Sequence, residues 1–268
     1  MKKFHTFAVC AYGDSPYLEA CLRSVTSQSR PTQVILCTST PSSYLDHLAE
    51  RYGIPVFVRE GKSNIREDWN FAYEKADSLF VTIAHQDDVY EKEYVKTLES
   101  AWRKYPDMTL FTTDYLTVKE HQVIWGERLT MVKKILRLPL RISRLNHLKW
   151  IKLSALRFGN SICCPACSYN KEILGEPLFR SSLTFALDWD NLVELARRPG
   201  RFICAERPLV FHRLHPGAET NASMKDSRRA GEEMLMFSRL WPRPAAALLM
   251  KGYQFAYGAY TEQKEAEE

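Results

Sequence analysis

The chain has 268 residues and 45% of them are hydrophobic, which is enough to bury the core of one large α/β domain or two small ones. No stretch approaches the roughly 18 apolar residues of a membrane-spanning helix, and Gly13, Asp14 and Pro16 interrupt the apolar N-terminus before it could act as a signal-peptide core. We therefore expect a cytoplasmic globular protein whose seven cysteines are reduced and mostly buried.

Short apolar runs alternate with helical patterns over residues 1–120. The runs predict strands at Thr6–Cys10, Gln33–Cys37, Pro55–Val58, Leu79–Ile83 and Met108–Thr112. Between the first two runs, Ser15 can cap a helix with Pro16 at its first position, and apolar side chains recur on one helical face from Leu18 to Val25. This alternation is typical of βα units that build a largely parallel sheet, whose ligands bind beyond the carboxyl ends of the strands.

The formal net charge of +5 is concentrated in one part of the chain. Nine cations and no carboxylate lie between Arg128 and Arg157, and we call this stretch the basic segment. Pro139 should end or kink a helix there, so residues 121–158 are predicted to form a basic insertion or flap. Leucines interleaved with these cations suit peripheral contact with an anionic membrane, whereas the alternative is that the leucines pack on the domain and the cations are solvated.

Residues 159–225 are predicted to form a second structured part of the same domain. It has a strand-like run at Ser161–Tyr169, a helix from about Trp189 to Arg197 and a strand at Phe202–Ala205. A helical extension is expected over residues 226–268, with a charged tail from Thr261 onward that frays.

An apolar strand ends abruptly in His85-Gln86-Asp87-Asp88 before the next helix begins. Paired carboxylates at a strand end can hold Mg²⁺ or Mn²⁺, which bridges the phosphates of a nucleotide-sugar and neutralises the departing diphosphate. The alternative is that Asp87 and Asp88 only cap the helix that starts near Glu91.

The order of these motifs resembles that of the family 2 glycosyltransferases of GT-A fold. Their Asp-x-Asp-Asp signature is matched by His85-Gln86-Asp87-Asp88, and Val9-Cys-Ala-Tyr12 is similar to their opening strand and nucleotide loop. The resemblance implies a Rossmann-like sheet flanked by helices with a smaller acceptor-side part. It also implies transfer of a sugar from a nucleotide-diphosphate donor to a hydroxyl of a sugar or lipid-linked acceptor, in surface polysaccharide or glycoconjugate synthesis.

The resemblance also assigns candidate ligands. Those expected to bind the nucleotide are Ala11, Tyr12, Ser39, Asn64, Asn70, His85, Gln86 and Arg213. Asp87, Asp88 and His215 are expected to hold the divalent metal, Mn or Mg. Two departures stand out: the second strand ends in hydroxyls over Cys37-Thr-Ser-Thr-Pro41 where the family has Asp-Asp-Gly-Ser, and His85 replaces the first acid, although an imidazole can still bind a ribose hydroxyl or a metal.

Leu187-Asp-Trp-Asp190 opens a predicted helix and resembles the family's Glu-Asp pair, whose Asp is the catalytic base. An inverting transfer needs a carboxylate that takes the proton of the acceptor hydroxyl, and Asp188 is the candidate. Alternatively Asp188 is an ordinary N-cap, and Asp190 is the next candidate for the base.

The run Phe211-His-Arg-Leu-His-Pro216 looks like the family's Arg-x-His element, in which Arg213 pairs with phosphate and His215 completes the metal shell. By itself this run is more often a polar loop. Cys163-Cys-Pro-Ala-Cys167 contains a Cys-x-x-Cys but lacks the partners of a zinc site and the context of a redox site.

Two other functions remain open at the level of sequence. A nucleotidyltransferase of similar fold would begin with a glycine-rich loop and a basic residue, both of which are missing from Tyr12-Gly-Asp-Ser-Pro16. A non-catalytic module that binds membrane or nucleotide is compatible with the missing Asp-Asp-Gly-Ser. No nucleic acid partner is expected.

Overall fold

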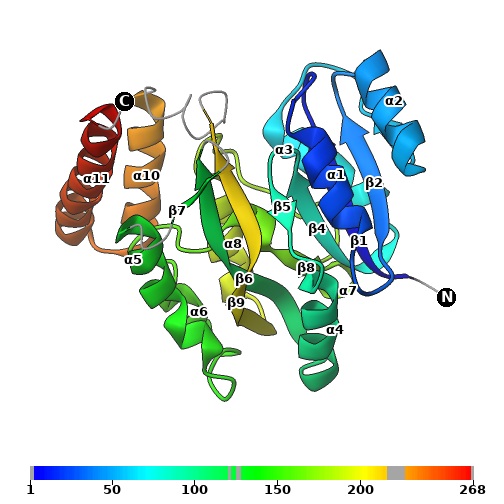
Figure 1. The fold of residues 1–268 in the computed structure, drawn as a ribbon. Coiled ribbons are helices and arrows are strands. Elements are labelled where there is room, and N and C mark those ends of the chain that lie inside the picture. The colour runs from blue at the N-terminus through cyan, green and yellow to red at the C-terminus, as the bar shows by residue number, and fades with distance from the viewer. Residues whose placement is uncertain (1–2, 120–121, 125–127, 216–226, 267–268) are drawn as a thin grey trace.

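One nine-stranded sheet forms the centre of the computed structural model, which describes residues 3–119, 122–124, 128–215 and 227–266 (Figure 1). The strands are β1 (Lys3–Ala11), β2 (Gln33–Thr38), β3 (Val56–Val58), β4 (Ser78–His85), β5 (Val89–Tyr90), β6 (Met108–Lys119), β7 (Gln122–Ile124), β8 (Ser168–Asn170) and β9 (Arg201–Leu214). The helices are α1 (Leu18–Thr26), α2 (Ser43–Tyr52), α3 (Ile65–Lys75), α4 (Tyr94–Lys104), α5 (Arg128–Arg137), η1 (Leu138–Arg141), α6 (Lys149–Ser154), η2 (Cys164–Ala166), α7 (Lys171–Leu174), α8 (Leu187–Arg197), α10 (Ser227–Leu240) and α11 (Arg243–Ala266).

The strand order is β3-β2-β1-β4-β8-β6-β9-β5, with β7 beside β6. β1 runs parallel to β2 and β4, and β6 runs parallel to β9. β8 is antiparallel to both β4 and β6, so these two strands point the same way. The predicted α/β fold with a largely parallel sheet is confirmed, and the long parallel strands present their carboxyl ends at one edge.

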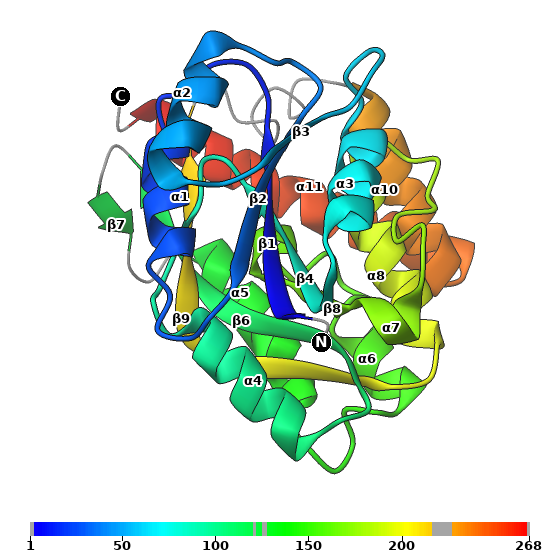
Figure 2. The same cartoon turned by 90° about the vertical axis from the view of Figure 1, so that its right-hand side faces the viewer.

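Helices cover both faces of the sheet because alternate strand residues point to opposite sides. Phe7 and Val9 pack with the apolar faces of α1, α2 and α4, whereas Ala8 belongs to the core under α3, α8 and α10 (Figure 2). The stripe from Leu18 to Val25 is buried as predicted. α1 begins at Leu18 rather than at Pro16, because the amide of Leu18 closes a turn onto the carbonyl of Ser15.

The run predicted as a strand at Ser161–Tyr169 is mostly not a strand. It contains the short helix η2, and only the residues from Ser168 onward join the sheet as β8. Pro165 explains the difference, because a proline has no amide hydrogen to donate to a strand ladder.

The basic segment forms α5, η1 and α6, and three of its cations are integral to the fold. Arg137 has a side chain only 1% exposed and pairs with the buried Asp114 of β6 at 2.9 Å. Arg141 pairs with the other oxygen of Asp114 at 2.8 Å. The Lys152 ammonium donates to two backbone carbonyls, of Arg198 and Gly200, just after α8. These three cations are therefore part of the packed domain, whereas the alternative prediction had the cations of this segment solvated.

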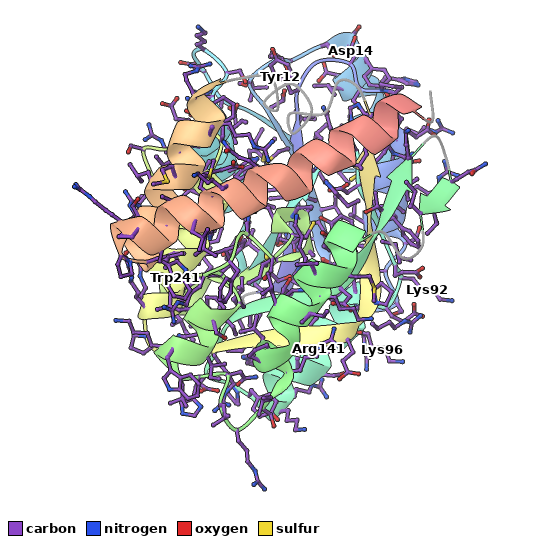
Figure 3. The ribbon with its side chains drawn as sticks, turned by 90° about the vertical axis from the view of Figure 1, so that its left-hand side faces the viewer. Tyr12, Asp14, Lys92, Lys96, Arg141 and Trp241 are labelled. Carbon is purple, nitrogen blue, oxygen red and sulfur yellow. The ribbon has the colours of Figure 1, made fainter. Side chains whose placement is uncertain are left out.

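α10 and α11 follow the sheet and lie over the core on the face that Figure 3 turns to the viewer. The ring of Phe237 in α10 meets Trp189 of α8 edge-on, with centroids 5.2 Å apart. α11 is helical to Ala266, where a frayed tail was expected, and residues 267–268 lie outside the described part. None of the helices in the described part of the chain is long and apolar enough to cross a membrane.

Candidate active site

The loop after β1 is held by one side chain from the acidic motif. The amide of Tyr12 donates to Gln86 Oε1 at 3.0 Å, and Gln86 Nε2 donates to the carbonyl of Tyr12 at 3.1 Å. The amide of Gly13, whose φ of 58° suits a residue without Cβ, donates to Thr40 Oγ1. Tyr12 is 65% exposed, so its ring stands free at the sheet edge where a nucleotide is predicted to bind.

Ala11 and Ser39 come together at this edge, because Ala11 pairs with Thr38 at the ends of β1 and β2. Asn64 caps α3 through its side-chain oxygen and lines a cavity of about 80 Å³ with Ser182 and Thr184. Asn70 is different. Its Nδ2 donates to the carbonyl of Phe179 and its Oδ1 accepts the amide of the same residue, so both polar atoms are used inside the fold. Asn70 therefore fixes the chain at Phe179, and its contact with the nucleotide stays a prediction.

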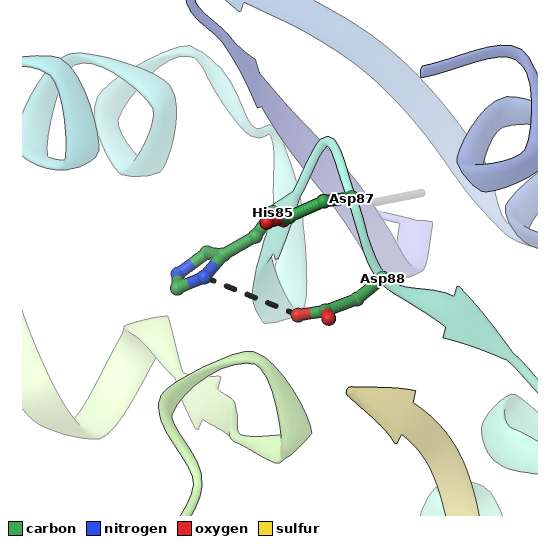
Figure 4. Close-up of side chains that lie close together, drawn as sticks. All are labelled: His85, Asp87 and Asp88. Carbon is green, nitrogen blue, oxygen red and sulfur yellow. Dashed lines mark ion pairs between the residues drawn. The ribbon is translucent and has the colours of Figure 1, made fainter. Parts of the chain in front are cut away.

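Three side chains that could bind a metal ion converge at the end of β4. One nitrogen of His85 and one carboxylate oxygen each of Asp87 and Asp88 lie within 4.8 Å of one another (Figure 4). His85 Nδ1 is 4.0 Å from Asp88 Oδ2, and both this Oδ2 and His85 Nε2 are buried without a hydrogen-bond partner. Buried polar atoms are rarely left unpaired. Two carboxylates and an imidazole with spare acceptor atoms fit a divalent cation.

The end of β9 brings two histidines to these acids. His215 Nε2 lies 3.0 Å from Asp87 Oδ2, and His212 Nδ1 lies 3.0 Å from Asp88 Oδ1. Arg213 contributes two donors, since its amide bonds Asp88 Oδ1 and its Nε bonds the carbonyl of Asp87. The structure thus joins the acidic motif to the Arg213–His215 element. His212 also contacts the acidic motif, although it was not among the predicted ligands.

Burial alone would raise the pKa of the Asp88 carboxyl, because the charged form is less well solvated. The adjacent His212 and His85, together with the Arg213 amide, outweigh that effect and lower the pKa below its ordinary value. Asp88 is accordingly a carboxylate, which is the form that can bind a cation.

Aromatic rings pack against the imidazoles of His85 and His215 and fix their orientation. Trp69 of α3 stacks on His85 with ring centroids 5.1 Å apart and planes inclined by 24°. Tyr17 lies 4.7 Å from the His215 ring, and the Arg213 guanidinium lies over the face of Tyr17 at 4.7 Å. Such contacts limit the rotamers of the site before any ligand binds.

Asp188 is the second acidic element of the site, and it lies in the first turn of α8. Asn160 Nδ2 donates to Asp188 Oδ2 at 2.6 Å, and the amide of Trp189 donates to Oδ1 at 2.7 Å. Burial raises the pKa of Asp188, and these hydrogen bonds and the nearby Lys133 offset only part of the rise. A half-buried carboxylate with a raised pKa has the properties of a general base.

The sequence model for glycosyl transferase family 2 matches residues 6–172, more than half of the chain. The chain belongs to this family. It is a glycosyltransferase, in agreement with the resemblance seen in its motifs.

The fold of this glycosyltransferase is similar to that of several solved GT-A glycosyltransferases. TarS 1–349 from S. aureus in complex with UDP-GlcNAc aligns with a TM-score of 0.64 at 15% identity, over 92% of this chain and 70% of that one. The mannosyltransferase PcManGT from Pyrobaculum calidifontis, in complex with GDP-Man and Mn²⁺, gives 0.61 at 15% identity, over 97% and 76%. Glucosyl-3-phosphoglycerate synthase from Mycobacterium tuberculosis gives 0.59 at 14% identity, over 89% and 80%. No curated protein sequence matches the chain.

Asp190, the next candidate for the base in this glycosyltransferase, has another role. It is 4% exposed, accepts a hydrogen bond from Ser181 Oγ at 2.6 Å and pairs with Arg239 of α10. Asp190 thus attaches α10 to α8 through its ion pair with Arg239. Asp188 is bonded only to the neutral Asn160 and to a backbone amide among the hydrogen bonds of the described residues, and it stays the candidate for the base.

A carboxylate from α10 also holds the chain just before Asp188. Glu232 accepts hydrogen bonds from the amides of Thr184, Phe185 and Ala186 at 2.7 to 3.1 Å. The contact spans 46 to 48 residues, and no local pattern in the sequence could have revealed it. Glu232 therefore fixes the approach to the helix that carries Asp188.

The cysteines near Asp188 act as small apolar side chains. All seven thiols are free, and Cys164 and Cys167 are buried. Burial raises the pKa of Cys167 to about 12, so it stays a thiol at neutral pH.

Proposed function

We propose that this glycosyltransferase transfers a sugar with inversion from a nucleotide-diphosphate donor to a hydroxyl acceptor, with the help of a divalent cation. The observation that carries the proposal is the cluster of His85, Asp87 and Asp88 at the end of β4, joined there by His215. This cluster lies on the sheet edge that also holds the Tyr12 loop, because Gln86 bonds the backbone of Tyr12.

Asp188 is the proposed base. Its carboxylate takes the proton of the acceptor hydroxyl as the hydroxyl oxygen bonds to the anomeric carbon. The bond from that carbon to the diphosphate oxygen breaks on the opposite face, and the diphosphate leaves with the electron pair. Asn160 and the amide of Trp189 hold the carboxylate in position for this step.

Asp87, Asp88 and His215, with His85 beside them, are the proposed ligands of Mn²⁺ or Mg²⁺. When bound, the ion would neutralise charge on the leaving diphosphate. The structure of PcManGT is a complex with GDP-Man and Mn²⁺, which supports a cation in the related fold. Arg213 holds the Asp87 carbonyl through Nε, and the rest of its guanidinium is proposed to pair with phosphate oxygens.

The nucleotide is proposed to lie over Ala11, Tyr12 and Ser39, with His85 at the ribose. Asn64 stays in this set, since only its side-chain oxygen is used in capping α3. Gln86 acts on the nucleotide indirectly, through the backbone of Tyr12. The similar structures in complex with UDP-GlcNAc and with GDP-Man support a nucleotide-sugar donor. Because the two nucleotides carry different bases, the base of this protein's donor is a question for experiment.

The test is release of nucleoside diphosphate from UDP-, GDP- and dTDP-sugars with Mn²⁺ present. We expect one donor class to be turned over, and we expect Asp188→Asn to reduce turnover without loss of donor binding. In a parallel assay, formation of a nucleotide-sugar and pyrophosphate from a nucleoside triphosphate and a sugar 1-phosphate would instead establish a nucleotidyltransferase. Tight binding of every donor tried without any turnover, with acceptor hydroxyls supplied, would favour a non-catalytic module.

We also propose a cytoplasmic enzyme that meets the membrane through the basic segment, where a lipid-linked acceptor of polysaccharide or glycoconjugate synthesis is presented. α5 is amphipathic in an unusual sense: Arg137 points inward, and large apolar side chains point to solvent. The exposed apolar residues are Met131, Val132, Ile135, Leu138 and Ile142, each 46% to 60% exposed. An apolar face on a segment with no carboxylate suits an anionic lipid surface.

A further inference from the structure

A second cavity, of about 300 Å³, lies between α6 and the C-terminal ends of α8 and α10. It is separate from the proposed active site, since α8 carries Asp188 in its first turn and Arg197 in its last, about 14 Å apart along the axis. Figure 3 shows this side of the molecule and labels Trp241, whose ring packs against Arg157 of the cavity lining.

Four cations line this cavity: Lys149, Arg157, Arg197 and Arg239. No carboxylate is among the described residues that line it. Arg239 and Arg197 are paired with Asp190 and Glu194, which lie outside the lining. The other two positive charges have no carboxylate partner within the described part of the chain.

Much of this positive surface is held in place before a ligand arrives. The Arg157 guanidinium lies 4.0 Å above the Trp241 ring, whose Nε1 donates to the carbonyl of Arg157. The ion pair with Asp190 restrains Arg239 in the same way. Ordering a side chain in advance lowers the entropy lost on binding, so guanidinium groups fixed around a hollow form an efficient anion site.

The remaining lining is apolar. Trp150 is 61% exposed, and Leu153 and Leu240 are half-buried beside it. The exposed indole of Trp150 can contact an apolar part of a ligand with its ring and a polar part with its N–H. Planar guanidinium groups match the oxygens of a phosphate in two-point contacts better than they match a spherical anion.

We propose that this cavity binds the phosphate group of an amphiphilic phosphate ester, with the apolar part of the ligand against Trp150. The charged part meets Lys149, Arg157 and Arg197. The proposal is independent of the sugar-transfer reaction, because none of these residues touches Asp188 or the acidic cluster. The phosphate group could come from a soluble ester or from a lipid headgroup, and the experiment separates these sources.

Binding of inorganic phosphate is measured by calorimetry at low salt in EDTA, which keeps divalent cations away from the acidic cluster. The test variant is Lys149→Gln combined with Arg197→Gln, two surface changes that leave the Arg239–Asp190 pair intact. We expect affinity to fall about tenfold or more, as for the loss of a charge-assisted contact. Lys96→Gln on α4, an exposed cation elsewhere, should leave affinity unchanged, and all variants should keep the wild-type Tm.

The source is identified with vesicles of phosphatidylcholine with and without phosphatidic acid. Loss of phosphatidic-acid-dependent sedimentation in the double variant, and in Trp150→Ala, assigns the site to a lipid headgroup. Unchanged sedimentation with weakened phosphate binding assigns it to a soluble ester. Phosphate affinity that is equal in wild type and double variant, or that falls as much in Lys96→Gln, would overturn the proposal.

Discussion

His215 Nε2 lies 3.0 Å from Asp87 Oδ2, although 128 residues separate the two in the chain. β9 makes this contact possible, because its parallel pairing with β6 carries its carboxyl end to the same sheet edge as the end of β4. The pair is preformed, with the imidazole in contact with the carboxylate that is proposed to bind the cation.

Asp87→Asn should abolish metal-dependent donor binding and transfer together, because a neutral amide oxygen is a poor ligand for a hard dication. Turnover should fall roughly 100-fold or more. Donor affinity with and without Mn²⁺ is measured by calorimetry, with the exposed surface change Asp46→Asn as control. Unchanged Mn²⁺-dependent affinity in Asp87→Asn would remove this residue from the metal site.

Asp188→Asn should lower turnover by about 10² to 10⁴ while donor affinity stays near that of the wild type. Because burial raises the pKa of Asp188, the wild-type turnover should be lost as pH falls through a value above the ordinary range of an aspartate. A pH–rate profile whose acid limb lies within that ordinary range would contradict this reading.

The raised pKa of Asp188 also predicts how the stability of the protein depends on pH. The folded state binds a proton at Asp188 more tightly than the unfolded state does, so the contribution of Asp188 to stability is full at low pH and is lost as pH rises through the folded pKa. Asp188→Asn should therefore be the more stable protein at pH 8, and the advantage should shrink below pH ~4. Asn160 Oδ1, buried and unpaired, can turn to accept from the new amide. Thermal melts across pH measure the difference.

Glu232→Gln should reduce turnover about 10-fold to 100-fold with little change in donor affinity, since the approach to Asp188 would shift. A role exerted through Asp188 has a distinctive signature: in the Asp188→Asn background the second change should cost almost nothing more. Glu233→Gln, which loses only the ion pair with Arg229, is the matched control. Additive losses in the double variant would mean that Glu232 merely supports the fold.

Mutations in the basic segment should have two kinds of effect: changes to exposed apolar residues should weaken vesicle binding, and changes to buried cations should lower stability. Val132→Ser with Ile135→Ser should weaken sedimentation with anionic vesicles and leave the Tm unchanged, because both side chains are more than half exposed. Arg137→Gln should lower the free energy of unfolding by about 3 to 5 kcal/mol, as expected when one partner of a buried ion pair is removed. Leu248→Ser on α11, 72% exposed, is the control for loss of surface apolar area.

The early strands could be predicted because each is an uninterrupted apolar run, such as Phe7 to Val9, with buried neighbours on both faces. β9 was predicted only at its start. Its middle carries Glu206 and Arg207, both exposed, and an irregular register with β6, so hydrophobicity alone does not mark it as one strand. Pro165 opposes the strand predicted at Ser161–Tyr169, because it has no amide hydrogen to donate to a ladder.

The proximity of Asp87 and His215 could be anticipated from the order of motifs. Other roles are set by contacts that sequence does not encode locally. Both polar side-chain atoms of Asn70 form hydrogen bonds with the backbone of Phe179, which lies 109 residues further along the chain. His212 could have been recognised only by knowing which face of β9 turns to Asp88.

Gln86 lies between His85 and Asp87 in the chain, and its side chain forms hydrogen bonds with both the amide and the carbonyl of Tyr12. A shift of the Tyr12 loop must therefore move the turn that carries the acidic cluster, and the reverse holds as well. The proposed donor nucleotide and cation would then share one thermodynamic cycle, in which each ligand changes the affinity of the other by the same factor. Gln86→Ala removes these two hydrogen bonds. It would uncouple the two affinities and leave the proposed direct ligands of the nucleotide and of the cation in place.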